Sequence, residues 1–316
     1  MELIADVGGT NSRCALVNEG GHPVKISVFA NARYKSLGAA LTDYLHETSA
    51  TPEHAAIAVA APVTGDEVRM TNRNWHFSGQ SLRDELRLDQ LRIINDFTAV
   101  ALALPRLLDQ DLVQIGGGAP RANTAMAAIG PGTGLGVSGL IPGLNGWAPI
   151  SGEGGHTTLA PGTEKEVQVI DALRDQYGHC SAERIISGPG LVTLYNTLRR
   201  LAAYPDDKVS PRDVSNRAKA GDPVARETLA MFFALLGSVS GNLALVLGAL
   251  GGVFVAGGIA PALLDTMQHS DFRQRFEDKG RYSKYLRDIP TYVVKHPTPA
   301  LLGLASIAQD MGERAN

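Results

Sequence analysis

Apolar residues occur in short runs that alternate with stretches of helical spacing. Near the start, residues 3–5 and 13–17 predict two strands joined by a glycine turn, and residues 24–30 predict a third strand. Apolar positions recur every three to four residues over 36–48, which predicts a helix, and the apolar run at 55–60 predicts a buried strand. The alternation of strands and helices is typical of an α/β fold.

The pattern of the opening hairpin returns in the second half of the chain. Residues 124–141 read TAMAAIGPGTGLGVSGLI, which is again an apolar strand, a glycine-threonine turn and a second strand. A strand over 91–94 and a helix from near Thr98 to just before Pro105 precede this repeat. A final helix is predicted over 300–311.

Two hairpins of this kind, one heading each half, predict two α/β domains. A chain of 316 residues is also longer than most chains that fold around a single hydrophobic core. We expect a small domain formed by residues 1–105 with 300–316, and a large domain formed by 106–299. In this division the last helix crosses back to the first domain.

Residues 228–264 contain no charged side chain and admit two interpretations. Length and the Gly237–Gly241 spacing are compatible with a membrane helix. Ser238, Ser240 and the glycine break at 251–252 argue against it, as does the lack of clustered Lys and Arg at either end. We therefore expect a buried helix followed by a core strand over 253–256, and no membrane partner.

Composition excludes several classes of function. The net charge is -3 and the basic residues are scattered, which argues against a nucleic-acid partner. Cys14 and Cys180 are far apart and in no metal-ligand spacing, which indicates a reduced, intracellular protein. Asp6 interrupts the first apolar run, so the start lacks the long apolar core of a signal peptide.

The first turn, in the stretch LIADVGGTNSR, carries candidate chemistry. Asp6 lies within an apolar strand, where an unpaired charge is costly, so it must have a partner or a function. Gly8 and Gly9 allow unusual backbone angles and leave room for a phosphate to approach the N–H groups. The alternative is an ordinary tight hairpin.

Two polar clusters follow apolar strands or lie in glycine-rich loops. Asn95 and Asp96 end a strand before a helix, which is where open α/β sheets bind ligands, although a plain helix cap has the same pattern. Glu153 and His156 occur together in SGEGGH. A lone histidine is more often a core residue, but this pairing suits a donor and an acceptor for hydroxyl groups.

Residue spacing alone does not decide the role of two further features. Glu183 is expected early in a helix capped by Ser181, and there a surface acid that favours the helix dipole is the preferred interpretation. Gly257 and Gly258 follow a predicted strand and suit either the close approach of a base or ribose or a simple turn at a helix start. No Gly-Lys dipeptide exists, which excludes a P-loop. The GxGxxG match at 134–139 precedes a strand, so a dinucleotide site is not expected.

Taken together, the motifs resemble those of the bacterial glucokinases, within the actin-like sugar kinase and ATPase superfamily. They are ADVGGTN, IINDFTAV, GPGTGLGV, SGEGGH, SAERIISGPGL, GGVFVAGGI and FEDKGR, in that order along the chain. The resemblance implies a two-domain actin-like ATPase (ribonuclease H-like) fold with a nucleotide and sugar cleft between the domains. It also implies ATP-dependent phosphorylation of D-glucose to glucose 6-phosphate in glycolysis, with Mg2+, by a cytoplasmic homodimer.

The resemblance also assigns roles to residues. It implies that Asp96 is the general base, and that Asn95, Asp96, Glu153, His156 and Glu183 bind glucose. It implies that the nucleotide is held by Gly8, Gly9, Thr10 and Asn11 in one turn, by Gly132, Thr133 and Gly134 in another, and by Gly257 and Gly258 near adenosine. Asp6 is implied to lie near the magnesium ion and the phosphates. No cysteine-rich zinc motif follows His156, unlike in the repressor-type sugar kinases.

Two alternatives of function remain open at this point. A kinase for mannose, fructose or an amino sugar would use the same motifs. An actin-like ATPase of a chaperone or filament would share the two phosphate turns but would not need Glu153, His156 and Glu183. ATP turnover that depends on a hexose indicates a glucokinase or a kinase for another hexose, whereas turnover that no hexose changes indicates the ATPase.

Overall fold

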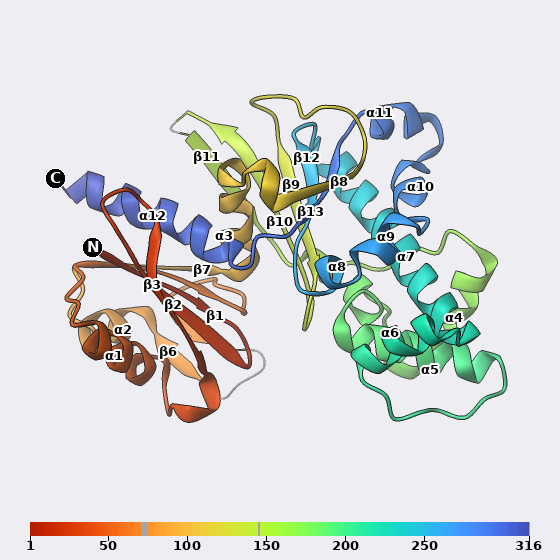
Figure 1. The fold of residues 1–316 in the computed structure, drawn as a ribbon, viewed down its shortest axis with the longest axis horizontal. Helices are drawn as coiled ribbons and strands as arrows, with labels where there is room; N and C mark the ends of the chain where they lie inside the picture. The colour runs from red at the N-terminus through yellow and green to blue at the C-terminus, as the bar shows by residue number, and fades with distance from the viewer. Residues whose placement is uncertain (71–74, 145, 316) are drawn as a thin grey trace. The chain divides into compact units, whose positions relative to one another are not determined.

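The computed structural model describes residues 1–70, 75–144 and 146–315, and side chains up to residue 312 (Figure 1). Contacts divide the chain into two compact units. The first comprises residues 1–108, 143–151 and 296–316, and the second comprises 109–142 and 152–295. These units differ from the expected domains mainly at residues 143–151, which pack in the first unit.

The first unit contains a five-stranded sheet of order β3-β2-β1-β4-β7. The strands β1, β2 and β3 pair antiparallel, whereas β1, β4 and β7 run parallel. The elements of this unit are β1 (Glu2–Val7), β2 (Asn11–Val17), β3 (Pro23–Ala30), α1 (Leu37–Thr48), β4 (His54–Val59), β5 (Glu67–Arg69), β6 (His76–Ser78), α2 (Gly79–Glu85), β7 (Gln90–Asn95), α3 (Asp96–Ala103), β11 (Gly146–Ser151) and α12 (Pro299–Ala315).

Alternate residues of the strands bury opposite faces of this sheet. Leu3 and Ala5 pack in one core with Leu41 and Tyr44 of α1. Helix α12 packs against β1, β4 and α3. Helix α1 begins where the Ser36 hydroxyl accepts a hydrogen bond from the Ala39 N–H at 3.1 Å. The expected helix over 36–48 and the expected final helix are thus present, the latter extended to Ala315.

The second unit contains strands in the order β10-β9-β12-β13-β8, with β9, β12 and β13 parallel. The elements of this unit are β8 (Leu112–Gly116), β9 (Met126–Pro131), β10 (Leu135–Gly143), α4 (Glu164–Tyr177), α5 (Gly188–Leu201), α6 (Pro211–Ala220), α7 (Pro223–Leu247), β12 (Gly252–Val255), α8 (Ile259–Ala262), α9 (Leu264–Gln268), α10 (Phe272–Glu277), α11 (Ser283–Arg287) and β13 (Thr291–Val294). The hairpin of β9 and β10 is the second hairpin that the sequence predicted.

The uncharged stretch forms the long helix α7 and the strand β12. By length and composition α7 is able to cross a membrane, but 67 % of its apolar window is buried inside the protein. A Cβ at Gly237 or Gly241 would overlap the carbonyl oxygen of Phe272 or Phe276 on α10. The GxxxG spacing therefore serves close packing of two helices within the second unit, as the buried-helix interpretation requires.

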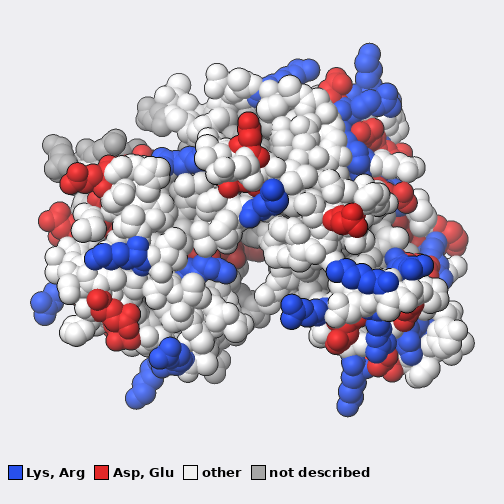
Figure 2. Space-filling model, viewed as in Figure 1, with Lys and Arg blue, Asp and Glu red and all other residues white. Residues whose placement is uncertain are grey.

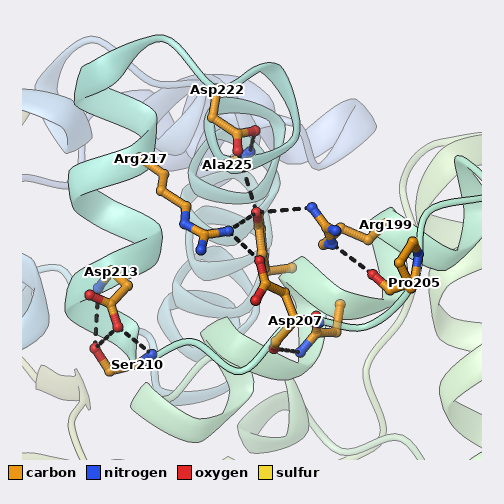
Figure 3. Close-up of polar contacts among 10 residues, drawn as sticks. Arg199, Pro205, Asp207, Ser210, Asp213, Arg217, Asp222 and Ala225 are labelled. Carbon is orange, nitrogen blue, oxygen red and sulfur yellow. Dashed lines mark hydrogen bonds and ion pairs between the residues drawn. The ribbon is translucent and has the colours of Figure 1, made fainter.

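A polar network holds the segment between α5 and α6 (Figure 3). Arg217 donates to the Tyr195 hydroxyl at 2.9 Å and to the Asp207 carboxylate at 2.6 Å. Tyr195 in turn donates to Asp222 at 3.3 Å, and the hydrogen bond from Arg217 lowers the pKa of Asp207. On the face drawn in Figure 2, Lys and Arg side chains are interspersed with Asp and Glu side chains.

Candidate active site

The first glycine turn, residues 8–10, joins β1 to β2. The Gly8 N–H donates to the Asn11 carbonyl at 3.1 Å. The buried Asn31 anchors the turn from outside it: its amide donates to the Gly8 carbonyl at 2.7 Å and accepts from the Ser12 hydroxyl at 2.7 Å. The Asn31 N–H also donates to the Thr10 carbonyl at 2.9 Å. Asn31 was not a candidate from the sequence, because nothing local marks a residue whose partners are about 20 positions away.

Asp6 lies directly opposite Arg13 in the ladder between β1 and β2. The Arg13 Nη1 atom is 3.2 Å from Asp6 Oδ2, and the Asp6 side chain is only 16 % exposed. Burial raises the pKa of Asp6 above its ordinary value, and the Arg13 guanidinium opposes part of that rise. The carboxylate within an apolar strand thus has a partner, and it stands beside the first glycine turn.

Asn95 and Asp96 lie at the junction of β7 and α3. Asn95 caps the helix, since its Oδ1 accepts from the Phe97 N–H at 2.9 Å and from the Thr98 N–H at 3.3 Å. Asp96 is the first helical residue, two positions before the expected start, and its Oδ1 accepts from the Phe97 N–H at 2.8 Å. The helix cap that the sequence offered as an alternative is therefore present at Asn95.

Within the first unit, the start of α3 is also tied to β11. The Thr98 and Ser151 hydroxyl oxygens are 3.0 Å apart. Thr98 is buried, so this hydrogen bond fixes the first turn of α3 from the side. The Asp96 carboxylate therefore stands on a capped and tethered helix start.

In the second unit, the loop after β11 and the segment before α5 lie side by side. An isolated bridge joins Thr158 to Ser181, and the Ala182 N–H donates to the Thr157 carbonyl at 2.9 Å. This pairing brings His156 and Glu183 together, with Nε2 and Oε1 3.9 Å apart. Two candidates 27 positions apart in the sequence therefore share one site.

The surroundings of Glu183 differ from those of an acid in a helix capped by Ser181. It lies in the short 3-10 helix Ala182–Arg184, and the Ser181 side chain makes no cap. The Glu183 Oε2 atom accepts from the Leu135 N–H at 2.8 Å, which joins it to the start of β10. The side chain is 31% exposed, and its carboxylate is bound to a backbone donor 48 positions away, a contact that the interpretation as a surface helix acid does not include.

The second glycine turn, residues 132–134, is closed by a hydrogen bond from the Gly132 N–H to the Gly134 carbonyl at 2.8 Å. The Gly188 N–H donates to the Gly132 carbonyl, also at 2.8 Å, so the start of α5 holds the turn. Gly257 has a φ of +79° and lies so near β9 that a Cβ would come within 2.5 Å of the Pro131 carbonyl oxygen. The Gly257–Gly258 turn and the second glycine turn are thus neighbours.

Glu153 has no side-chain cap contact with the following 3-10 turn Gly154–His156, and both Glu153 and His156 are exposed. Among the described residues, no group of three or more His, Cys, Asp or Glu side chains is arranged to hold a metal ion. A magnesium ion held jointly by a nucleotide needs only one or two protein carboxylates. Asp6, a single carboxylate beside the first glycine turn, fits that requirement.

Comparison with known proteins identifies the family. The glucokinase family model matches residues 3–311. A glucokinase of Chromobacterium violaceum is 49% identical over 310 residues, which cover 98% of this chain and 89% of that protein. The solved glucokinase from an Antarctic psychrotroph matches with a TM-score of 0.88 and 35% identity over 98% of both chains.

A more distant solved structure matches in fold. It is a ROK family glucokinase from Streptomyces griseus in complex with glucose and AMPPNP, with a TM-score of 0.66 and 18% identity over 98% of this chain and 99% of that one. These matches confirm the predicted α/β fold of the actin-like kinase class. Since the family model and relatives near half identity both span almost the whole sequence, the chain belongs to the glucokinase family.

Proposed function

We propose that the side chains predicted from the sequence carry the glucokinase activity of this chain, the phosphorylation of D-glucose by ATP to glucose 6-phosphate. The observation that carries the assignment is the meeting of His156 and Glu183 next to the second glycine turn. Transfer of a phosphoryl group from a nucleotide to a sugar requires that the two ligands lie close together. Contact between a sugar-binding acid and a phosphate-binding turn meets that requirement.

The gap between His156 and Glu183 suits a sugar hydroxyl. A separation of 3.9 Å is too long for a direct hydrogen bond. One hydroxyl group can instead accept from His156 Nε2 and donate to Glu183 Oε1 at the same time. The other carboxylate oxygen is held by the Leu135 N–H, so the acid is already oriented before a sugar binds. We assign Glu153 and Asn95 to further hydroxyl groups of the sugar.

Asp96 is assigned as the general base. Its carboxylate is held at Oδ1 by the Phe97 N–H, and it stands at the start of a capped helix. In this role it accepts the proton of the sugar 6-hydroxyl as that oxygen attacks the γ-phosphorus of ATP. Such a contribution is typically about 10²- to 10⁴-fold in rate.

The nucleotide is assigned to the glycine turns. The transition state of phosphoryl transfer is loose, and its charge must be met by donors placed in advance. The turns at 8–11 and 132–134 supply backbone N–H groups, and the turn at 257–258 approaches adenosine. When magnesium is bound with ATP, it neutralises phosphate charge, and Asp6 is the carboxylate that would hold it.

The other partners are proposed from the family. We assign a homodimer in the cytoplasm, with glucose and ATP as its ligands and with no nucleic-acid or membrane partner. Light scattering coupled to gel filtration measures the mass of the assembly directly. A mass of one chain at micromolar concentration contradicts the homodimer.

A coupled assay over a panel of hexoses tests the function. Purified protein is supplied with Mg-ATP and with glucose, mannose, fructose or glucosamine, and ADP formation is followed with and without sugar. We expect turnover that depends on glucose and is fastest with it. ADP formation that no hexose changes would support the ATPase alternative, and a faster rate with another hexose would reassign the substrate.

A further inference from the structure

The two glycines that bound the second glycine turn have different surroundings. A Cβ at Gly132 would meet nothing within 4 Å, so its missing side chain leaves open space. A Cβ at Gly134 would overlap the Glu183 carboxylate at Oε2. Neither glycine has a positive φ, so backbone strain does not explain either one. A side chain at position 134 would therefore compete for space with the Glu183 carboxylate.

The Glu183 carboxylate is held in this position by a hydrogen bond from the backbone. Its Oε2 accepts a hydrogen bond from the Leu135 N–H at 2.8 Å. Leu135 is the residue directly after Gly134. The Glu183 backbone is fixed as well, because the Glu183 carbonyl accepts from the Ser187 hydroxyl at 2.9 Å. A side chain at position 134 would thus leave the backbone in place and displace the carboxylate, which is the mobile end of the residue.

We infer that Gly134, although it lies in the turn assigned to phosphates, determines affinity for the hexose. Its missing side chain lets the Glu183 carboxylate dock on the Leu135 N–H with Oε1 directed to His156 and the sugar. The two glycines of this turn then serve different ligands. Gly132 faces open space on the side assigned to the nucleotide, and Gly134 faces the acid assigned to the sugar. This inference rests on the proposed function, in which Glu183 binds glucose.

Two matched glycine-to-alanine variants test the division. For Gly134→Ala we expect the KM for glucose to rise about 5- to 100-fold, because Glu183 loses its backbone donor and its orientation. The KM for ATP should change less than about threefold. Gly132→Ala is the control, since its methyl group enters the open space; it should leave the KM for glucose within about threefold and raise the KM for ATP.

A shorter acid provides the decisive second measurement. Glu183→Asp withdraws the carboxylate by one methylene and so removes the overlap with a Cβ at position 134. In this background, adding Gly134→Ala should raise the KM for glucose less than about twofold further, a strongly non-additive result. If the effects of the two substitutions multiply, Gly134 does not act through Glu183 and the inference is overturned.

The outcomes separate this inference from the proposed function. Calorimetric titration of the wild-type protein with glucose, together with the coupled assay, establishes whether glucose is bound and turned over at all. Absence of both contradicts the proposed function. A wild-type protein that binds glucose, with a Gly134→Ala variant that alters only the KM for ATP, contradicts the inference alone. Should Gly134→Ala fail to fold, the double variant with Glu183→Asp, which has no overlap, still gives the comparison with Glu183→Asp.

Discussion

Glu166 of α4 and Arg275 of α10 form a buried ion pair in the second unit. The two pairs of atoms are 2.6 and 2.9 Å apart, and the side chains are 3% and 13% exposed. Glu166 also accepts from the Gly162 N–H at 2.6 Å. The hydrogen bonds that Arg275 donates to Glu166 raise the pKa of Arg275, so the guanidinium keeps its charge at neutral pH.

Removal of one partner should be more costly than removal of both. Arg275→Met leaves the Glu166 carboxylate buried without its cation, and loss of one partner of a buried pair costs about 3–5 kcal/mol. A double variant, Glu166→Met with Arg275→Met, leaves no uncompensated charge and should recover about 2 kcal/mol or more of that loss. The control is Arg174→Met, whose partner Asp171 is half-exposed at 3.2 Å, and it should cost at most about 1 kcal/mol.

Urea unfolding followed by far-ultraviolet circular dichroism measures these differences. The probe matters because Trp75 and Trp147 both belong to the first unit, so tryptophan fluorescence does not report on the unit that is changed. Stability is compared from transition midpoints at a common slope. If Arg275→Met costs no more than Arg174→Met, or if the double variant loses the sum of its two single losses, the argument from buried charge is refuted.

Three further substitutions test the catalytic base, a helix contact and a helix cap. Asp96→Asn should lower kcat at least about 100-fold with little change in glucose binding, and near-normal turnover would remove Asp96 from the mechanism. Gly303→Ala should destabilise the protein by about 1–3 kcal/mol in thermal unfolding, because its Cβ would overlap a carbonyl oxygen of α3, whereas Gly65→Ala, with open space, should not; equal losses would contradict this. Hydrogen bonds from Ser210 lower the pKa of Asp213 from 3.8, so the stability that its carboxylate contributes is present above pH 3.8 and is lost as pH falls through the folded-state pKa. Asp213→Asn should therefore lower Tm at pH 7 and not at pH values well below 3.8, and a Tm difference independent of pH would contradict this.

The spacing of apolar residues predicted the strands and helices whose formation depends on neighbouring residues. The strands at 13–17 and 24–30 and the helix over 36–48 correspond to β2, β3 and α1 because alternation and helical spacing reflect which faces are buried. The start of α3 was predicted two residues late, near Thr98. The capping of that helix by Asn95 made Asp96 helical, and the sequence offered this cap only as one of two interpretations.

Contacts between distant segments could not be predicted in the same way. Glu183 has the sequence surroundings of an exposed helix-start acid, and the position of its carboxylate depends on a backbone donor in β10. Asn31 is polar and fully buried, and only the return of β3 beside the first turn gives it partners. In both cases the partner is set by strand topology, which no window of neighbouring residues contains.

The glycines show how a correct pattern can have more than one cause. The doublets after strands predicted close approach to a ligand, because the absence of Cβ opens space on either side of a turn. In the structure, that space is already filled at Gly134 by the Glu183 carboxylate and at Gly257 by the Pro131 carbonyl, whereas at Gly132 and Gly258 it is open. A Cβ is thus excluded at one glycine of each pair and would meet no neighbouring atom at the other. Neighbouring glycines of one motif therefore differ in what a side chain would meet, and only the identity of the nearest atom distinguishes them.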